Sequence, residues 1–186
     1  MNYTIEIATG NYSSTAIAVK EGASRIELCS ALSEGGLTPS YAYLLKCRND
    51  FKTPLFPIIR PRGGDFLYTD DEFEVIKEDI AFCKKANFDG IVTGFLTREG
   101  DIDRKRLSAI VELAGPMQVT FHRAFDRCKN PFSALEDIIN AGCKRALTSG
   151  QQLTAPEGVD LIQDLVAVAA NRNTVVCIIL FIGFFF

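Results

Sequence analysis

Short β-rich runs alternate with amphipathic stretches along the chain, and this alternation limits the accessible folds more than any other sequence feature. The runs that we expect to form strands begin at residues 3, 25, 55, 90, 118, 145 and 174, so they recur every 22 to 35 residues. A βα unit of an eight-fold barrel takes about 30 residues. Strands and helices that alternate in this way form parallel sheets joined by right-handed crossovers.

The pattern predicts seven strands and six helices. The expected strands are Tyr3–Ile7, Arg25–Leu28, Leu55–Ile59, Gly90–Thr93, Gln118–Phe121, Arg145–Thr148 and Thr174–Ile179. The expected helices are Ser14–Glu21, Ser40–Asn49, Asp70–Ala86, Asp103–Ala114, Pro131–Ala141 and Val159–Ala170. Thr38-Pro39 and Asn130-Pro131 are typical of an N-cap followed by the first helical residue. Glycines that follow helices favour helix ends at Gly22, Gly115 and Gly142.

Two parallel α/β architectures fit this alternation, a (β/α)8 barrel and an open Rossmann-type sheet. The open sheet would carry a glycine-rich fingerprint after its first strand. The corresponding segment, Ala8-Thr9-Gly10-Asn11, has a single glycine. Polar residues follow nearly every strand, which suits loops that converge on the mouth of a barrel. We therefore favour a barrel-type single domain over residues 1–186.

Composition and charge exclude several partners. The chain has 23 acidic and 20 basic residues and a formal net charge of −3, so nucleic acid and anionic membranes are poor candidates. Six cysteines without a CxxC pair indicate reduced thiols and a cytoplasmic location. Glu6 interrupts the first apolar stretch and excludes a secretory signal there. The apolar segment 174–186 is shorter than the roughly 20 residues of a membrane-spanning helix.

The residues at the strand ends are the candidates for chemistry, because the site of a barrel enzyme lies at the carboxyl ends of its strands. We expect catalytic roles for Glu6, Glu27, His122 and Arg123. His122 is the only histidine, and its ordinary pKa suits acid or base catalysis. Charges in these positions are also compatible with solvated loops. No lysine closes a strand, since Lys52 and Lys144 precede theirs, which argues against Schiff-base chemistry.

The segment 60–66 is the most distinctive loop. Two arginines can hold a carboxylate or phosphate bidentately, and paired glycines let the backbone approach an anion. We therefore expect anion binding by Arg60, Arg62, Gly63, Gly64 and Asp65, with a tight turn bearing surface arginines as the alternative. Cys29 closes the second strand and is either a small buried hydrophobe or a soft ligand for Cu(I).

Five segments together resemble the CutC copper-homeostasis family. They are Arg25-Ile26-Glu27-Leu28-Cys29-Ser30, Ser33 to Ser40 (SEGGLTPS), Ile59 to Phe66 (IRPRGGDF), Val119 to Asp126 (VTFHRAFD) and Leu147-Thr148-Ser149-Gly150. The match runs from about residue 3 to about residue 176. The resemblance implies an eight-fold barrel, a cytoplasmic location and a role in copper handling. Asp126 and Ser149, which lie in these motifs, complete the expected ligand-binding set.

Two departures from the family pattern bear on function. Family members often carry a cysteine two residues after the first-strand glutamate, as a partner for the second-strand cysteine, but this chain has Ala8 there. Cys29 would then be the one metal ligand, and Cu(I) binding would be weak. After Val176 the sequence no longer follows the family. We therefore expect a truncated barrel of about six βα units plus a seventh strand.

Three functions remain open on the sequence alone. The resemblance favours a copper homeostasis protein that binds a copper ion. The arginines, carboxylates and His122 favour a barrel enzyme acting on a small anionic substrate, a phosphate or a carboxylate. The departure at the C-terminal end is compatible with a non-functional truncated remnant. The expected partners are a metal ion or a small anion, without nucleic acid or membrane, and a homo-oligomer through open strand edges.

Overall fold

The computed structural model describes residues 4–170, 172 and 175–178, and for 175–178 it describes the backbone alone. The chain divides into two compact units. We call Met1–Thr93 with Glu112–Gln118 the N-terminal unit, and Gly94–Val111 with Val119–Phe186 the C-terminal unit. Each unit is described by itself.

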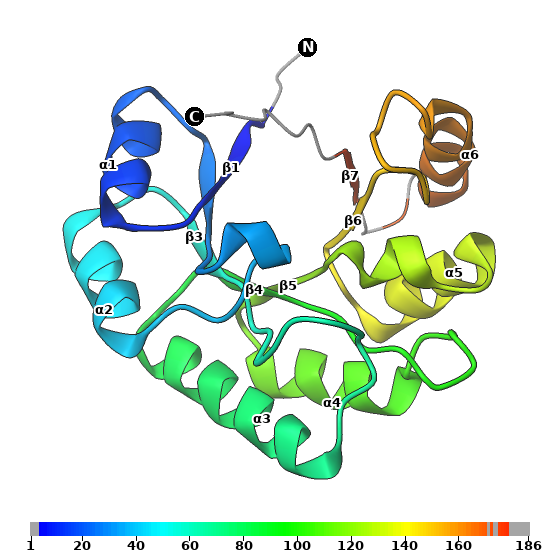
Figure 1. Cartoon of the computed structure of the whole chain (residues 1–186), viewed down its shortest axis with the longest axis horizontal. Coiled ribbons are helices and arrows are strands. Elements are labelled where there is room, and N and C mark those ends of the chain that lie inside the picture. Colours follow the sequence, from blue (N-terminus) through cyan, green and yellow to red (C-terminus); the bar gives the residue numbers. More distant parts are fainter. Residues whose placement is uncertain (1–3, 171, 173–174, 179–186) are drawn as a thin grey trace. The chain divides into compact units, whose positions relative to one another are not determined.

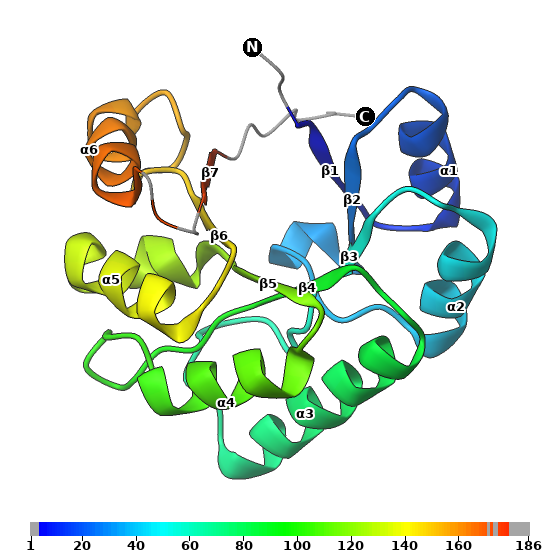
Figure 2. The ribbon, with the colours of Figure 1, turned by 180° about the vertical axis from the view of Figure 1, so that it is seen from behind.

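The N-terminal unit is built on parallel strands. Its sheet has the order β1-β2-β3, with strands β1 (Glu6–Thr9), β2 (Arg25–Leu28) and β3 (Leu55–Pro57). Strand β4 (Gly90–Thr93) follows next to β3, where Ile58 and Val92 form a parallel bridge. The helices are α1 (Tyr12–Lys20), α2 (Tyr41–Asp50), α3 (Asp70–Lys85) and the short 3-10 helix η1 (Leu32–Glu34). Figures 1 and 2 show α1 and α2 on one side of β1, β2 and β3.

The C-terminal unit repeats this arrangement. Its strands β5 (Gln118–Phe121), β6 (Arg145–Thr148) and β7 (Val175–Ile178) are parallel neighbours in that order. Its helices are α4 (Arg104–Ala114), the 3-10 helix η2 (Arg123–Arg127), α5 (Pro131–Ala141) and α6 (Val159–Ala169). The division between the units assigns the last turn of α4 and the first residue of β5 to the N-terminal unit.

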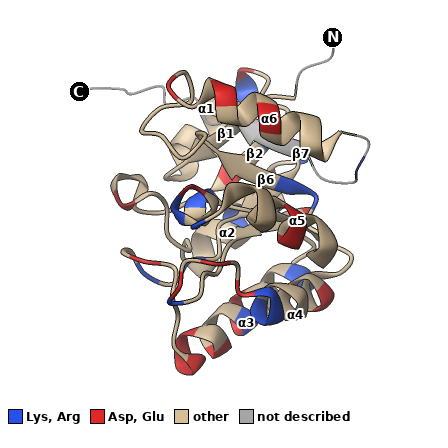
Figure 3. Cartoon of the chain, turned by 90° about the vertical axis from the view of Figure 1, so that its right-hand side faces the viewer, with Lys and Arg blue, Asp and Glu red and all other residues tan. Residues whose placement is uncertain are grey.

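Local sequence signals explain where several helices begin and end. Thr69 caps α3 in a capping box with Glu72, the acidic first turn suits the positive end of the helix dipole, and Lys84 and Lys85 occupy the last turn. Figure 3 shows acidic residues in red at one end of this helix. Asn130 accepts from two backbone amides at the start of α5. These signals fix helix ends without help from distant residues.

The observed boundaries confirm most of the predicted elements and correct two. Strand β1 covers Glu6–Thr9 where 3–7 was expected, because it pairs in register with Arg25–Leu28 of β2. The N-cap of α2 is Ser40, so the expectation for Thr38-Pro39 was wrong. The Thr38 hydroxyl accepts a hydrogen bond from the Arg60 amide at 2.9 Å instead. The first and last residues of the expected seventh strand, 174 and 179, lie outside the described residues.

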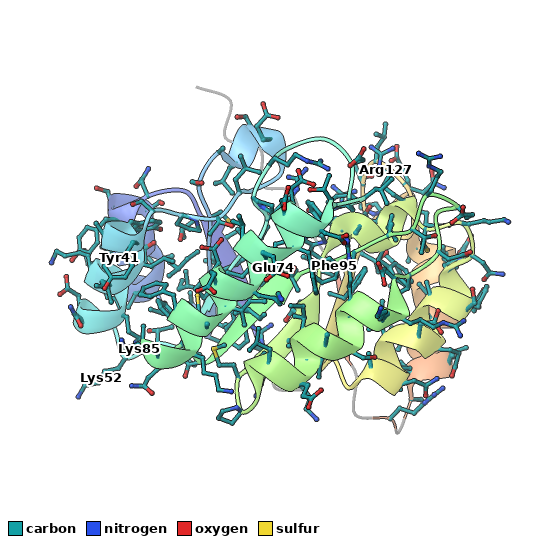
Figure 4. The ribbon with its side chains drawn as sticks, turned by 90° about the horizontal axis from the view of Figure 1, so that it is seen from below. Tyr41, Lys52, Glu74, Lys85, Phe95 and Arg127 are labelled. Carbon is teal, nitrogen blue, oxygen red and sulfur yellow. The ribbon has the colours of Figure 1, made fainter. Side chains whose placement is uncertain are left out.

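The core of each unit is apolar and close-packed. In the N-terminal unit, Cys29, Phe56, Ile58 and Val92 form a buried cluster on one side of the sheet. At the surface of the same unit the ring of Tyr41, labelled in Figure 4, packs on Phe82 with 4.4 Å between ring centroids, which joins α2 to α3. In the C-terminal unit the largest fully buried side chains include Phe95, Phe121 and Phe125. The predicted site residues lie against these cores.

Candidate functional site

Strand β2 and the residue that follows it present three chemically active side chains on one face. Arg25, Glu27 and Cys29 are spaced two residues apart, and in a β-strand that spacing points side chains to the same side. Arg25 forms an ion pair with Glu6 of β1, with 2.7 Å between Nε and Oε2. Glu6 begins β1 and does not close it, so this expected strand-end residue lies beside the start of β2.

Glu27 is a buried carboxyl group without a cationic partner in the described part of the chain. Its residue is 8% exposed. Its one carboxyl hydrogen bond comes from the Cys29 thiol, with 3.6 Å between Sγ and Oε1. Glu27 therefore has one carboxyl oxygen bonded to the thiol.

Burial changes the protonation of both groups. Removal from water, and then repulsion from Glu6, raise the pKa of the Glu27 carboxyl to about 8. Burial, and then the nearby Glu27, raise the pKa of the Cys29 thiol well above its ordinary value. At neutral pH the carboxyl and the thiol are therefore both mainly protonated. A protonated thiol is neither a good nucleophile nor a ready metal ligand.

The described residues do not form a ready-made metal centre. Within them, no three His, Cys, Asp or Glu side chains are grouped so that they could hold a metal ion. Ala8 pairs in register with Glu27, so a cysteine in its place would be next to the Glu27 and Cys29 face of the sheet. Cys29 thus contributes a thiol to this face of the sheet. Ala8 contributes no second soft ligand for a metal.

Arg60 is a buried guanidinium that organises two loops. It is 5% exposed. Its Nη1 donates to the carbonyl oxygens of Glu34 at 2.6 Å and Gly36 at 3.1 Å, and its Nη2 donates to that of Gly64 at 3.2 Å. The guanidinium also lies over the Phe66 ring, 5.1 Å from its centroid. Among the described residues, no carboxylate forms an ion pair with it.

Arg62 bonds to residues that follow it closely in the chain. It forms ion pairs with Glu72 and Asp65, at 2.5 Å and 3.0 Å, and it donates to backbone carbonyls of the same segment. A side chain at Gly63 would meet Oε2 of Glu34 at 3.1 Å, and Gly64 has a φ of +83° that favours glycine. The charges of Arg62 and Asp65 are therefore matched within the loop.

In the C-terminal unit, His122 follows β5 and caps η2. Its Nδ1 accepts a hydrogen bond from the Ala124 amide at 3.2 Å, so Nδ1 carries no proton in this arrangement. The ring is buried against Gly94, where a Cβ atom would come within 2.6 Å of Nδ1. The glycine therefore makes room for the imidazole, and one ring nitrogen is used to hold the turn.

Arg123, Asp126 and Ser149 bind one another after β5 and β6. Asp126 accepts from Nε of Arg123 at 2.9 Å and from the amide and hydroxyl of Ser149, each at 3.1 Å to Oδ2. It also accepts from the Thr148 hydroxyl and the Gln151 amide. Nη2 of Arg123 donates to the Ser149 hydroxyl at 2.7 Å. These groups join η2 to the loop after β6, and that uses much of their hydrogen-bonding capacity.

The structure brings the predicted residues together within each unit. Glu6, Glu27, Cys29 and the loop of Arg60 belong to the N-terminal unit, whereas His122, Arg123, Asp126 and Ser149 belong to the C-terminal unit. A common cavity for both groups remains a prediction. Two surface cavities, of about 300 and 400 Å³, are lined by other residues, namely Asp101, Ile102, Arg104, Asn130, Ser133, Ala134 and Asp137, and Gly10, Asn11, Tyr12, Ser30, Ser40, Tyr43 and Lys46.

Two arginines next to the predicted sites were missed from the sequence, the partly buried Arg25 and the buried Arg145. Arg25 pairs with Glu6, and Arg145 of β6 donates from Nε to the Thr120 hydroxyl of β5 at 3.0 Å. Alternation along β2 could have revealed Arg25, because it shares a strand face with Glu27.

Lys52 extends outward from the loop before β3 in Figure 4. Within the described residues, no helix is both long and apolar enough to cross a membrane.

Comparison with known proteins agrees with this fold. The family model described as the CutC family matches residues 3–179. The family protein CutC of Vibrio vulnificus (strain YJ016) is 48% identical over 174 residues, which are 92% of this chain and 70% of that protein. The family protein CutC of Salmonella newport (strain SL254) is 50% identical over 163 residues, 88% of this chain and 66% of that protein. The chain thus spans about two thirds of these relatives' length.

Solved structures confirm the predicted fold class. The CutC protein of Streptococcus agalactiae, described as a candidate copper homeostasis protein, superposes with a TM-score of 0.86 at 28% identity, over 94% of this chain and 87% of that one. Oxaloacetate acetylhydrolase, at 12% identity, shares the fold alone, with a TM-score of 0.64 over 94% of this chain and 66% of that one. The fold is a parallel α/β fold of the (β/α) barrel type, incomplete in the described residues, and the chain belongs to the CutC family.

Proposed function

We propose that this chain serves copper homeostasis in the cytoplasm, with copper as its cargo and Cys29 as the ligand that contacts the ion. The observation that carries the proposal is the Cys29–Glu27 pair at the end of β2 in a member of the CutC family. A thiolate is the side chain that Cu(I) prefers, and a neighbouring carboxyl can accept or release the proton that accompanies binding.

Binding at this pair is weak and depends on pH. The Cys29 proton must leave before the sulfur can bind copper, and burial opposes that loss. The described residues provide no group of three potential ligands, and position 8 carries a methyl group in place of a thiol. We expect copper affinity to rise with pH, because the thiolate fraction of Cys29 rises with pH.

A Cu(I) titration against a chromophoric chelator tests this function. Cys29→Ala should abolish binding, whereas Cys143→Ala, at another buried cysteine, should leave it unchanged. Ala8→Cys should tighten binding by at least tenfold, because it adds a second thiol next to the same face. Tight binding that survives Cys29→Ala would exclude the proposed site.

A second candidate function is an enzyme that acts on a small carboxylate or phosphate. The observation that favours it is Arg60, a buried cation that contacts carbonyl groups but forms no ion pair with a described carboxylate. Burying an unpaired charge is costly, and an anionic ligand would offset that cost. Inorganic phosphate or malonate should raise the unfolding temperature in a saturable way that potassium chloride at equal ionic strength does not reproduce.

A further inference from the structure

We propose that segment 31–36 is a cover over the Cys29 thiol, and that Arg60 is the positioning residue that holds this cover closed. The inference rests on the proposed copper function, because it says how an ion gains access to its ligand. Cys29 is 1% exposed, so an ion can reach its sulfur only when neighbouring residues move. Segment 31–36 lies outside the parallel strands, so its movement leaves the sheet intact.

The cover is a loop whose two ends are bonded to each other. The residues on either side of it, Ser30 and Leu37, exchange two backbone hydrogen bonds, with N–O distances of 2.9 and 2.8 Å. The Ser30 hydroxyl also lies 3.1 Å from the carbonyl oxygens of Leu37 and Thr38 and can donate to either. Residues 31–35 are exposed. A loop with closed ends and an exposed outer surface can move as a unit while β2 remains paired.

Gly36 is the point at which the cover contacts the thiol. It is the one buried residue of segment 31–36. A Cβ atom on Gly36 would lie 3.3 Å from the Cys29 sulfur and 3.2 Å from Cδ1 of Ile58, and its φ of +87° favours glycine. The absence of a side chain therefore lets the backbone of the cover lie directly against the sulfur. This contact contributes to the enclosure of Cys29.

Arg60 supplies the hydrogen bonds that hold the cover in place. Its Nη1 donates to the carbonyl oxygens of Glu34 at 2.6 Å and Gly36 at 3.1 Å. Within the described part of the chain, these are the hydrogen bonds that leave segment 31–36, because its others join residues of the segment to one another. Hydrogen bonds from a charged donor to carbonyl groups are stronger than neutral ones. The guanidinium thus acts on Cys29 through Gly36, and loss of these bonds should free the cover.

The test measures how fast iodoacetamide modifies Cys29 in the native protein at one fixed pH. The buried Cys83 and Cys143 are references in the same molecule, and mass spectrometry follows the three peptides. Arg60→Ala should raise the Cys29 rate by about tenfold or more relative to both references. The substitution also removes a positive charge, which disfavours a thiolate, so a faster reaction reports access to the sulfur rather than its ionisation.

Two further variants separate the cover from a general loss of stability. Gly36→Ala retains Arg60 but places a Cβ atom against the sulfur at a positive φ, so it should also raise the Cys29 rate selectively. Arg60→Lys retains a charged donor and should restore part of the protection. Asp126→Asn is the matched control, because it removes hydrogen bonds in the C-terminal unit and should leave the ratio of Cys29 to the references unchanged.

Equal acceleration of Cys29, Cys83 and Cys143 in Arg60→Ala would overturn the proposal, because it would show that Arg60 only stabilises the fold. An unchanged Cys29 rate in this variant would overturn it as well. In Cu(I) transfer from a chromophoric chelator, Arg60→Ala should take up copper faster than wild type. Selective exposure of Cys29 without copper binding by wild type or any variant would overturn copper as the cargo and would support the cover.

Discussion

The thiol of Cys29 donates a hydrogen bond to Oε1 of Glu27, two residues earlier on the same face of β2, across 3.6 Å. The sulfur of this pair is the proposed copper ligand, and the carboxyl is its hydrogen-bond acceptor. Burial, and then Glu27, raise the pKa of the Cys29 thiol, whereas the hydrogen bond from this thiol lowers the pKa of the Glu27 carboxyl, which burial and Glu6 keep raised. The protonation of this pair therefore governs what the site can bind.

The raised pKa of Glu27 makes stability depend on pH. Because the folded-state pKa of about 8 exceeds the ordinary value of 4.5, the folded state binds this proton more tightly than the unfolded state. The contribution is fully present below pH 4.5 and is lost as pH rises toward about 8, at about 1.4 kcal/mol per pH unit. Glu27→Gln should remove this loss and be more stable than wild type at pH about 9 by several kcal/mol.

Urea unfolding at several pH values measures this effect. Glu78→Gln, at an exposed glutamate of α3, is the control and should retain the wild-type pH dependence. Parallel stability curves for wild type and Glu27→Gln across the range would show that Glu27 ionises with an ordinary pKa.

The Cys29 thiol should be inert in the native protein. Burial and Glu27 raise its pKa, and the side chain is buried. Iodoacetamide should modify Cys29 at least a hundredfold more slowly in folded than in urea-unfolded protein at neutral pH, as judged by mass spectrometry of the Cys29 peptide. Glu27→Gln should change this rate little, since at neutral pH the carboxyl is mainly protonated and the burial of the thiol remains. Equal rates in folded and unfolded protein would place this thiol at the surface.

Arg60→Ala should destabilise the protein as well as alter ligand binding. The substitution removes three hydrogen bonds to the loop carbonyls of Glu34, Gly36 and Gly64, and it leaves those carbonyls without their donor. We expect a loss of about 3 kcal/mol in the free energy of unfolding. Arg98→Ala, at an exposed arginine, should change it by less than about 0.5 kcal/mol. The sequence predicted anion binding by Arg60 or a surface position in a tight turn, and the buried hydrogen bonds of Arg60 add this structural role.

Asp126→Asn should loosen the loop after β6. Asp126 accepts from Arg123, Thr148, Ser149 and Gln151, and an amide cannot accept from all of these donors at once. We expect a loss of about 2 to 3 kcal/mol in unfolding free energy and faster hydrogen exchange over residues 148–152. Asp164→Asn, at an exposed position of α6, is the control. Unchanged exchange in this loop would show that the backbone alone holds it.

The sequence predicted elements whose ends are set by neighbouring residues. Asn130-Pro131 starts α5 and Gly142 ends it with a φ of 92°, as local capping rules require. The start of β1 depends on its pairing with Arg25, and the start of α2 depends on Ser40 rather than Thr38, whose hydroxyl is engaged by Arg60. Such distant pairings leave no local signal.

The same distinction applies to the site. The sequence indicated which charged residues follow the strands. It did not indicate which of their hydrogen-bonding groups already bond to other groups of the protein. Arg60 binds carbonyls about 25 residues earlier, and Asp126 binds a loop more than 20 residues later. Glu6 engages Arg25, a residue that the sequence analysis did not propose for the site, so this guanidinium forms no ion pair with Glu27 among the described residues. Competition among neighbours in space thus decides which predicted residues remain available.

The edge of β1 should allow self-association. Strand β1 is the first in the order β1-β2-β3, and no second strand partner for it is found among the described residues. Ile5 and Ile7 are 58% and 37% exposed beside this edge. Exposed strand edges with apolar side chains tend to pair with another chain, so we expect concentration-dependent oligomers in sedimentation velocity.

Ile7→Lys should shift the distribution toward the monomer, because a lysine at a strand edge opposes pairing. Ile17→Lys, at an exposed position of α1, should not. A monomer at all concentrations would mean that this edge is covered in solution.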